Sequence, residues 1–151
     1  MKTKLTFLLS LTFLFLFTSS CSDTLQDGNA AADRGDYKTA HRIYLKLAEK
    51  GNAKAQYKLY RLSAEQGDAE AQYKLGNFYY MGKGVPQDYK EAVKWYRLAA
   101  EQGYADAQYY LGGMYFDGLG VTQDHALAHM WLNNAGSNGD KDAVNNRNII
   151  E

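Results

Sequence analysis

The chain has 151 residues, of which 46% are hydrophobic and 23% charged, a composition that can bury the core of one domain. Lys2 and Lys4 are the only charged residues before the single cysteine, Cys21, so the remainder holds 15 basic and 17 acidic residues, a net charge of −2. This balance argues against a nucleic-acid-binding protein, which needs a basic surface. A single cysteine also excludes an internal disulfide, so packing must stabilise the domain.

Residues 1–20 have the organisation of a signal peptide. Lys2 and Lys4 precede an uncharged apolar run of 13 residues, from Leu5 to Phe17. A helix of that length spans about 20 Å, which is too short for a bilayer core of about 30 Å, so a cleaved signal is the better interpretation. The polar residues that follow predict a tether over 21–33, ahead of a folded domain over 34–151.

The position of Cys21, directly after Thr18-Ser19-Ser20, resembles a bacterial lipobox. That resemblance implies that the Cys21 thiol is lipidated and becomes the mature N-terminus. Thr18 departs from the usual leucine three residues before the cysteine. The alternative is ordinary cleavage after Ser20, which would leave a free thiol. In the same resemblance, Ser22 favours sorting to the outer membrane, facing the periplasm.

Two segments, 69–104 and 105–140, align without a gap and are identical at 16 of 36 positions. The shared small and apolar residues recur at helical spacing, which predicts two amphipathic helices per repeat, with glycine turns after the first helix and Asp88 and Asp124 as N-caps. The residues expected to form this framework are Ala71, Leu75, Gly76, Tyr79, Gly82, Gly84, Ala92 and Trp95, with Ala107, Leu111, Gly112, Tyr115, Gly118, Gly120, Ala128 and Trp131.

Partial units flank the two complete repeats. Residues 36–67 begin with a second-helix half, and 53–66 join the opening of one repeat to the end of another. We expect 53–66 to form one hybrid helix, with a local irregularity in superhelical twist over 53–68. Residues 141–151 align with a degraded first helix and predict a polar capping helix.

The repeat pattern resembles Sel1-like repeats, which are relatives of tetratricopeptide repeats. The resemblance implies an all-α, α/α solenoid of helix-turn-helix units with adaptor or regulatory roles. Some cysteine-rich relatives bind or hydrolyse β-lactams, but they carry paired cysteines that this chain lacks. We therefore expect no enzyme activity.

Few residues suggest chemistry. His125 and His129 share one helix face, but their counterparts in the preceding repeat are Tyr89 and Val93, and no third ligand lies at a defined spacing. The carboxylates fall at helix caps or on polar faces, and no pair is placed for acid–base work. No metal and no cofactor are expected.

The expected function is binding of a protein or peptide partner on the concave face. The candidate contacts are first-helix residues that differ between the repeats, together with a repeated tyrosine: Tyr73, Lys74, Asn77, Phe78, Met81, Tyr109, Tyr110, Met114 and Asp117. Packing between repeats explains the tyrosines equally well. Two further hypotheses for the whole chain are a β-lactam-acting enzyme and a glycan- or peptidoglycan-binding envelope component. The oligomeric state stays open.

Overall fold

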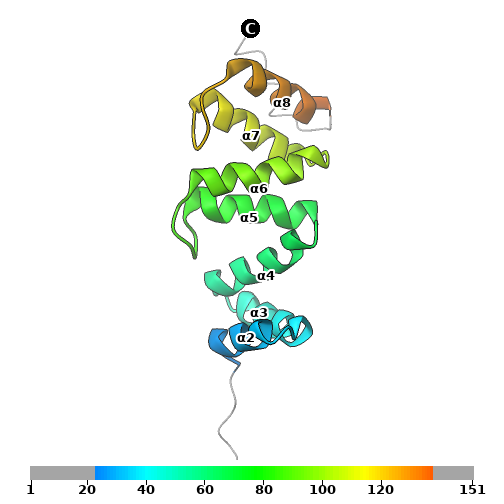
Figure 1. The fold of residues 1–151 in the computed structure, drawn as a ribbon, viewed down its shortest axis with the longest axis vertical. Helices are drawn as coiled ribbons and strands as arrows, with labels where there is room; N and C mark the ends of the chain where they lie inside the picture. The colour runs from blue at the N-terminus through cyan, green and yellow to red at the C-terminus, as the bar shows by residue number, and fades with distance from the viewer. Residues whose placement is uncertain (1–22, 138–151) are drawn as a thin grey trace, which may run out of the picture.

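The computed structural model describes residues 23–137, which form seven α-helices. In chain order these are α2 (Leu25–Asp33), α3 (Tyr37–Glu49), α4 (Ala53–Glu65), α5 (Ala69–Met81), α6 (Tyr89–Glu101), α7 (Ala105–Asp117) and α8 (His125–Ser137). Each helix packs against the next along the chain, and together they form an elongated stack (Figure 1). The predicted all-α solenoid of helix-turn-helix repeats is confirmed. The expected signal peptide, Cys21 and the capping segment 141–151 lie outside the described residues.

Short polar side chains explain where the helices begin. A helix leaves its first N–H groups without intrahelical partners, and an N-cap side chain accepts hydrogen bonds from them. The predicted caps Asp88 and Asp124 accept from the N–H groups of Glu91 and Leu127. Equivalent bonds cap α3, α4 and α5 through Asp36, Asn52 and Asp68. Over residues 23–137, none of these helices is long and apolar enough to cross a bilayer.

Two complete repeats, α5–α6 and α7–α8, depend on a glycine in the first helix of each pair. A Cβ added at Gly76 would lie 2.5 Å from the ring of Tyr96, which is fully buried on α6. A Cβ at Gly112 would lie 2.8 Å from Leu132 on α8. Because neither glycine has a side chain, a large residue of the second helix fits directly against the first-helix backbone.

A buried glutamine joins each repeat to the helix before it. Gln72 and Gln108 donate from Nε2 to the carbonyl oxygens of Ala64 and Ala100, at 3.2 and 2.9 Å. These carbonyls belong to the last turns of α4 and α6, where intrahelical donors run out. Each carbonyl also accepts from a backbone N–H, that of Gly67 or Gly103, so the shared glutamine is a structural residue that supplies a second donor at the end of the preceding helix.

The first helix corrects the expectation of a tether over 21–33. Thr24 caps α2 through a capping box with Asp27, and Gly28 packs under Tyr44 of α3. The hydroxyl of Tyr44 donates to Asn29 Oδ1 at 2.9 Å. Gly28-Asn29 thus repeats the arrangement of Gly76-Asn77 under Tyr96, and α2 is a shortened first helix. The pair Gly-Asn was the sequence signal for it, but α2 lacks the Ala-x-Ala-Gln opening of the later repeats.

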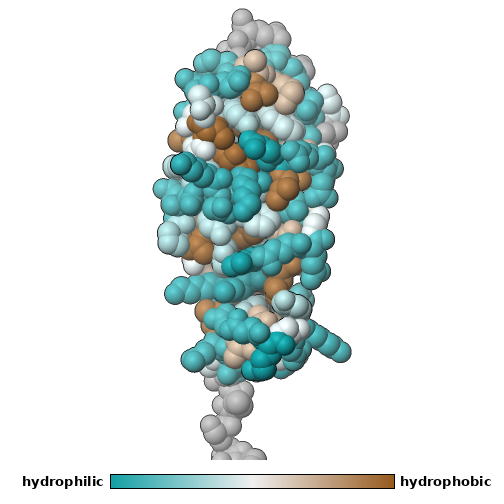
Figure 2. All heavy atoms as spheres, in the orientation of Figure 1, coloured by the Kyte–Doolittle hydropathy of each residue, from teal (hydrophilic) through white to brown (hydrophobic). Residues whose placement is uncertain are grey.

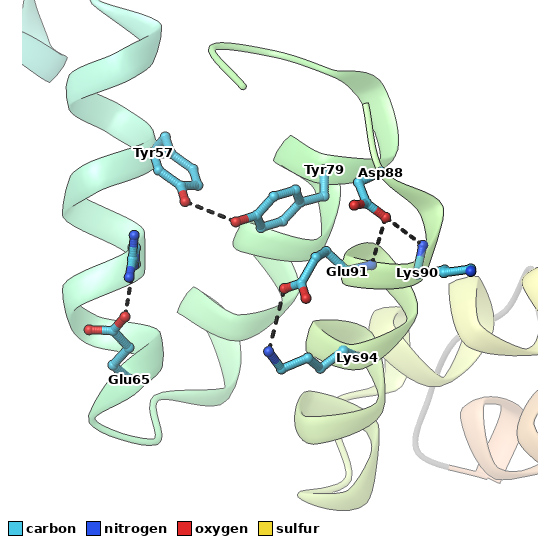
Figure 3. A network of polar contacts seen from close by, with 8 residues as sticks. Tyr57, Glu65, Tyr79, Asp88, Lys90, Glu91 and Lys94 are labelled. Carbon is cyan, nitrogen blue, oxygen red and sulfur yellow. Dashed lines mark hydrogen bonds and ion pairs between the residues drawn. The ribbon is translucent and has the colours of Figure 1, made fainter. Parts of the chain in front are cut away.

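The hybrid helix predicted over 53–66 is confirmed as α4. Short turns join it to both neighbours, so the alternation of short turns and long glycine loops is broken here. Figure 1 shows α4 inclined to α5 and α6. Tyr60 stands where first helices carry the close-approach glycine, which explains why α4 does not pair as α5 and α7 do. Helix α4 contacts α5 partly through Tyr57. The Tyr57 ring packs edge-on against the Tyr79 ring, and the two hydroxyl oxygens lie 2.9 Å apart (Figure 3).

Candidate functional site

A cluster of seven tyrosines joins α5, α6 and α7. Its rings lie in a continuous series of contacts with centroid separations between 5.2 and 6.5 Å. Its members are Tyr73, Tyr80, Tyr89, Tyr96, Tyr104, Tyr109 and Tyr110, called the tyrosine cluster below. The ring of Tyr73 on α5 contacts that of Tyr110 on α7 at 5.9 Å. First helices of successive repeats therefore meet in this cluster through their tyrosine rings.

Tyr96 is the base of the cluster. It is fully buried, stacks on Tyr110 at 5.5 Å, and donates its hydroxyl hydrogen to Asn77 Oδ1 at 2.7 Å. Burial, together with the neighbouring Tyr73 and Tyr110, raises the pKa of Tyr96, and burial likewise raises the pKa of Tyr73. Both phenols therefore stay neutral to a higher pH than an exposed tyrosine does. The other six rings are half-buried, so each shows part of its surface to solvent.

Polar side chains lie at the edge of the tyrosine cluster. Lys74 forms an ion pair with Glu70 at 2.6 Å, and its amino group lies 5.2 Å from the centroid of the Tyr60 ring on α4. Figure 2 shows apolar residues in small separate patches between hydrophilic side chains on the visible side of the molecule. This mixture of half-buried rings and polar groups is typical of protein-interaction surfaces.

Most of the predicted contact residues lie at or beside this cluster. Tyr73, Tyr109 and Tyr110 belong to it, and Asn77 holds the Tyr96 hydroxyl. Lys74 lies at its edge. The tyrosines pack between repeats and are also partly exposed, so the two interpretations of them do not exclude each other.

Two of the predicted contacts are corrected. Phe78 is 6% exposed and packs against Tyr57 and Tyr60 of α4, while Met114 is 2% exposed and lies in the core around α6 and α7. Neither can reach a partner. Met81, at 61% exposure, and Asp117 are exposed where α5 and α7 end, beyond the tyrosine cluster.

The repeat framework residues occupy interior and turn positions. The small and aliphatic ones are at most 4% exposed: Ala71, Leu75, Ala92, Ala107, Leu111 and Ala128. The aromatic ones are half-buried against the cores: Tyr79, Trp95, Tyr115 and Trp131. The turn glycines have left-handed backbone angles, with φ between 68 and 76°: Gly82, Gly84, Gly118 and Gly120.

Four members of the cluster were missed from the sequence: Tyr80, Tyr89, Tyr96 and Tyr104. Tyr80 and Tyr96 each follow another tyrosine by seven residues, which is two helical turns, and this spacing was the available signal. Tyr104 is the most informative. It occupies the N-cap of α7, where it makes no side-chain cap bond, while Asp68 caps α5 at the same repeat position. Its ring lies 5.2 Å from that of Tyr73 instead.

The histidines and carboxylates of the described residues can be placed individually. Over 23–137 no three His, Cys, Asp or Glu side chains gather as metal ligands. His125 lies against the Phe116 ring at 5.1 Å, and His129 Nδ1 lies 2.8 Å from Asn133 Nδ2. Glu91 of α6 forms an ion pair with Lys94, and its backbone N–H donates to the N-cap carboxylate of Asp88 (Figure 3).

Stacked helix pairs with a shared glycine, glutamine and alanine framework define an α/α solenoid, a class of protein-interaction scaffold. The chain belongs to the Sel1 repeat family, because the Sel1 repeat pattern matches residues 24–52, 55–68, 69–104 and 105–140. The first of these matches includes α2, in agreement with its role as a first helix. No curated protein gives a significant match to the chain.

Several solved structures are similar. The protective antigen c5321 of uropathogenic Escherichia coli strains, which displays an SLR fold, is 36% identical with a TM-score of 0.61, covering 76% of this chain and 29% of the antigen. A Sel1 repeat protein from Oxalobacter formigenes is 30% identical with a TM-score of 0.65, covering 91% and 53%. Cysteine-rich protein B of Helicobacter pylori shares the fold at 23% identity, with a TM-score of 0.58 and coverage of 73% and 93%. The chain thus spans about a third to a half of the first two relatives.

Proposed function

We propose that this protein is a non-enzymatic interaction module of the bacterial cell envelope, exported by residues 1–20 and anchored through lipid on Cys21. It binds a peptide or protein on the tyrosine cluster. The apolar run ending at Cys21 supports export, and the relatives of known structure are bacterial. Asp23, two residues after Cys21, pairs with Arg42 and Lys46 of α3 at 3.5 and 3.0 Å. The anchor would therefore hold the α2–α3 end of the stack close to the membrane.

The observation that carries the binding proposal is Tyr104. A side-chain cap typically contributes about 1 kcal/mol, and α7 lacks it because its N-cap residue is a tyrosine whose ring lies in the tyrosine cluster, 5.2 Å from that of Tyr73. Departures from the local rules for stability are expected at functional sites. Tyrosine gives a large contact area for little loss of side-chain entropy, and it is enriched at the energetic centres of interfaces.

Photocrosslinking in the native cell tests the proposal. A benzophenone amino acid replaces Asp106, which is exposed on α7 near Tyr73 and Tyr104, or Lys94, which is exposed on α6 and contacts Glu91 and the Trp95 ring. We expect one discrete crosslinked species from position 106 and none from position 94. Equal crosslinking from both positions, or from neither, would contradict a specific partner on the tyrosine cluster.

The variant Tyr104→Asp separates binding from stability. An aspartate here restores the cap that Asp68 provides in α5, which offsets the lost ring contact with Tyr73. We expect the free energy of unfolding to stay within about 1 kcal/mol of the parent value. The crosslink from position 106 should be strongly reduced. An undiminished crosslink in the folded variant would remove Tyr104 from the binding surface.

A further inference from the structure

A pocket opens between α2, α3 and α4, at the other end of the stack from α8. Its volume is about 200 Å³, and its walls include Ala32 and Tyr37, the buried Tyr44, and Lys58 and Leu62 of α4. A protein cavity of about 150 Å³ is large enough to bind benzene. Pockets for drug-sized ligands are larger, about 300–1,000 Å³. The space therefore has the scale of one large side chain.

The repeats themselves identify what fills this position. Residues 36–65, which contain α3 and α4, align without a gap with 88–117, which contain α6 and α7. In that register Tyr37, Tyr44 and Lys58 correspond to Tyr89, Tyr96 and Tyr110. Gly28-Asn29 of α2 corresponds to Gly76-Asn77 of α5, so Ala32 corresponds to Tyr80.

Tyr80 occupies the equivalent space in the next unit. Its ring centroid lies 5.5 Å from that of Tyr89, 6.5 Å from Tyr96 and 6.2 Å from Tyr110. Phe116 holds the same repeat position on α7 and contacts His125, the counterpart of Tyr89, at 5.1 Å. An aromatic ring thus stands at this position in both complete repeats. In the α2–α3 unit the position is Ala32, and the ring is missing.

We propose that the pocket at Ala32 receives an aromatic side chain, tyrosine or phenylalanine, from the protein partner. The inference rests on the proposed function and adds to it a specificity pocket. The partner's ring would lie on Tyr37, which is 57% exposed, as Tyr80 lies on Tyr89, at a separation favourable for aromatic pairs. The buried Tyr44 lines the pocket beside it.

The charges around the pocket suit a peptide carrying that ring. Arg61 and Glu65 neutralise each other at 2.7 Å. Asp33 and Lys58 form no ion pair within residues 23–137, and both line the pocket. A peptide backbone offers an N–H for the Asp33 carboxylate and a carbonyl oxygen for the Lys58 ammonium. Lys58 can also lie over the ring, as Lys74 lies over Tyr60 in the next helix.

Titration of the ¹⁵N-labelled protein with single-residue probes tests the pocket directly. The probes are the N-acetyl amides of L-tyrosine, L-phenylalanine and L-leucine. We expect the two aromatic probes to shift the amide signals of Ala32, Lys58 and Leu62, and leucine to bind about threefold or more weakly. Equal affinities for the three probes, or shifts located elsewhere, would overturn the proposal without requiring any variant to fold.

The variant Ala32→Tyr fills the pocket from within the chain. It should remain folded, because it restores the arrangement of the α5–α6 unit, and it should abolish the shifts caused by the tyrosine probe. Ala126→Tyr is the matched control, because Ala126 is exposed on α8 away from the pocket. Retained binding in Ala32→Tyr would refute the assignment.

The crosslink at position 106 tests the tyrosine cluster independently of the pocket. If that crosslink persists while the probes fail to bind the pocket, only the pocket is wrong. If the probes bind the pocket while the crosslink is absent, the pocket stands and the binding function of the tyrosine cluster fails.

Discussion

Replacement of Gly76 by alanine tests how the repeat packs. The added Cβ would lie 2.5 Å from Cδ1 and 2.6 Å from Cε1 of Tyr96. Real carbon contacts begin near about 3.5 Å, so the ring must move. Tyr96 is fully buried between α5 and α7, which leaves it little room. A shift of the ring would also weaken or break the hydrogen bond from the Tyr96 hydroxyl to Asn77 Oδ1.

The opposing terms can be compared in magnitude. Alanine gains about 1 kcal/mol of helix propensity over glycine. Overpacking costs about 1–3 kcal/mol, and loss of the hydrogen bond about 1 kcal/mol more. We therefore expect Gly76→Ala to lower the free energy of unfolding by about 2 kcal/mol. For a domain of this size the melting temperature falls by about 4 °C per kcal/mol, so the expected loss is about 8 °C.

Gly113→Ala is the matched control on α7. A Cβ at Gly113 has nothing within 4 Å, so the substitution keeps the propensity gain without a clash. We expect it to raise stability by about 0.5–1 kcal/mol. Urea unfolding followed by far-ultraviolet circular dichroism measures both variants. If Gly76→Ala is as stabilising as Gly113→Ala, the close approach of α5 and Tyr96 is not a packing constraint.

Three other predictions concern stability. Phe78→Ala should lower the free energy of unfolding, measured by thermal unfolding, by about 3–5 kcal/mol, because Phe78 is buried. Met81→Ala should change it by less than about 0.5 kcal/mol, because Met81 is exposed. Similar losses in both variants would show that Phe78 is not a core residue. Burial raises the pKa of Tyr96 above its usual value of 10.0. The stability that the buried neutral phenol contributes to the folded state is therefore complete below pH 10 and declines above it, as the unfolded chain ionises. By pH 11 the loss from this group is about 1.4 kcal/mol, and Tyr96→Phe should flatten the decline measured between pH 9 and pH 11. Gln108→Ala removes one of the two donors to the Ala100 carbonyl, which keeps its hydrogen bond from the Gly103 N–H at 2.9 Å. We expect a cost of about 0.5–1.5 kcal/mol, and an unchanged urea midpoint would be the contrary result.

The corrected residues show where comparison of the two repeats misled. Positions that differ between the repeats were expected to lie on the surface, and Phe78 and Met114 differ. Both are large and apolar, and a core accepts such exchanges when the filled volume is kept. A difference between two large apolar residues therefore does not mark exposure, whereas Met81 and Asp117, which differ in chemical character, are both exposed.

The hybrid helix shows the opposite case. The opening of one repeat joined to the end of another over 53–66 was sufficient to predict α4, because both fragments are helical with the same period. The shortened first helix α2 was not predicted, because Gly28-Asn29 alone is too short a match to the repeat to be recognised without Tyr44, which packs on it. Only the contact with Tyr44 gives that pair its meaning.

The amino-acid sequence by itself determined the helices, their caps, their turns and the family, because each depends on residues a few positions apart. It also marked the chain as a candidate for export through its first 20 residues. The tertiary structure decided which apolar residues are buried, which tyrosines meet, and that a pocket remains at Ala32. Those properties depend on side chains from three helices converging in space, and spacing along one helix cannot specify that convergence.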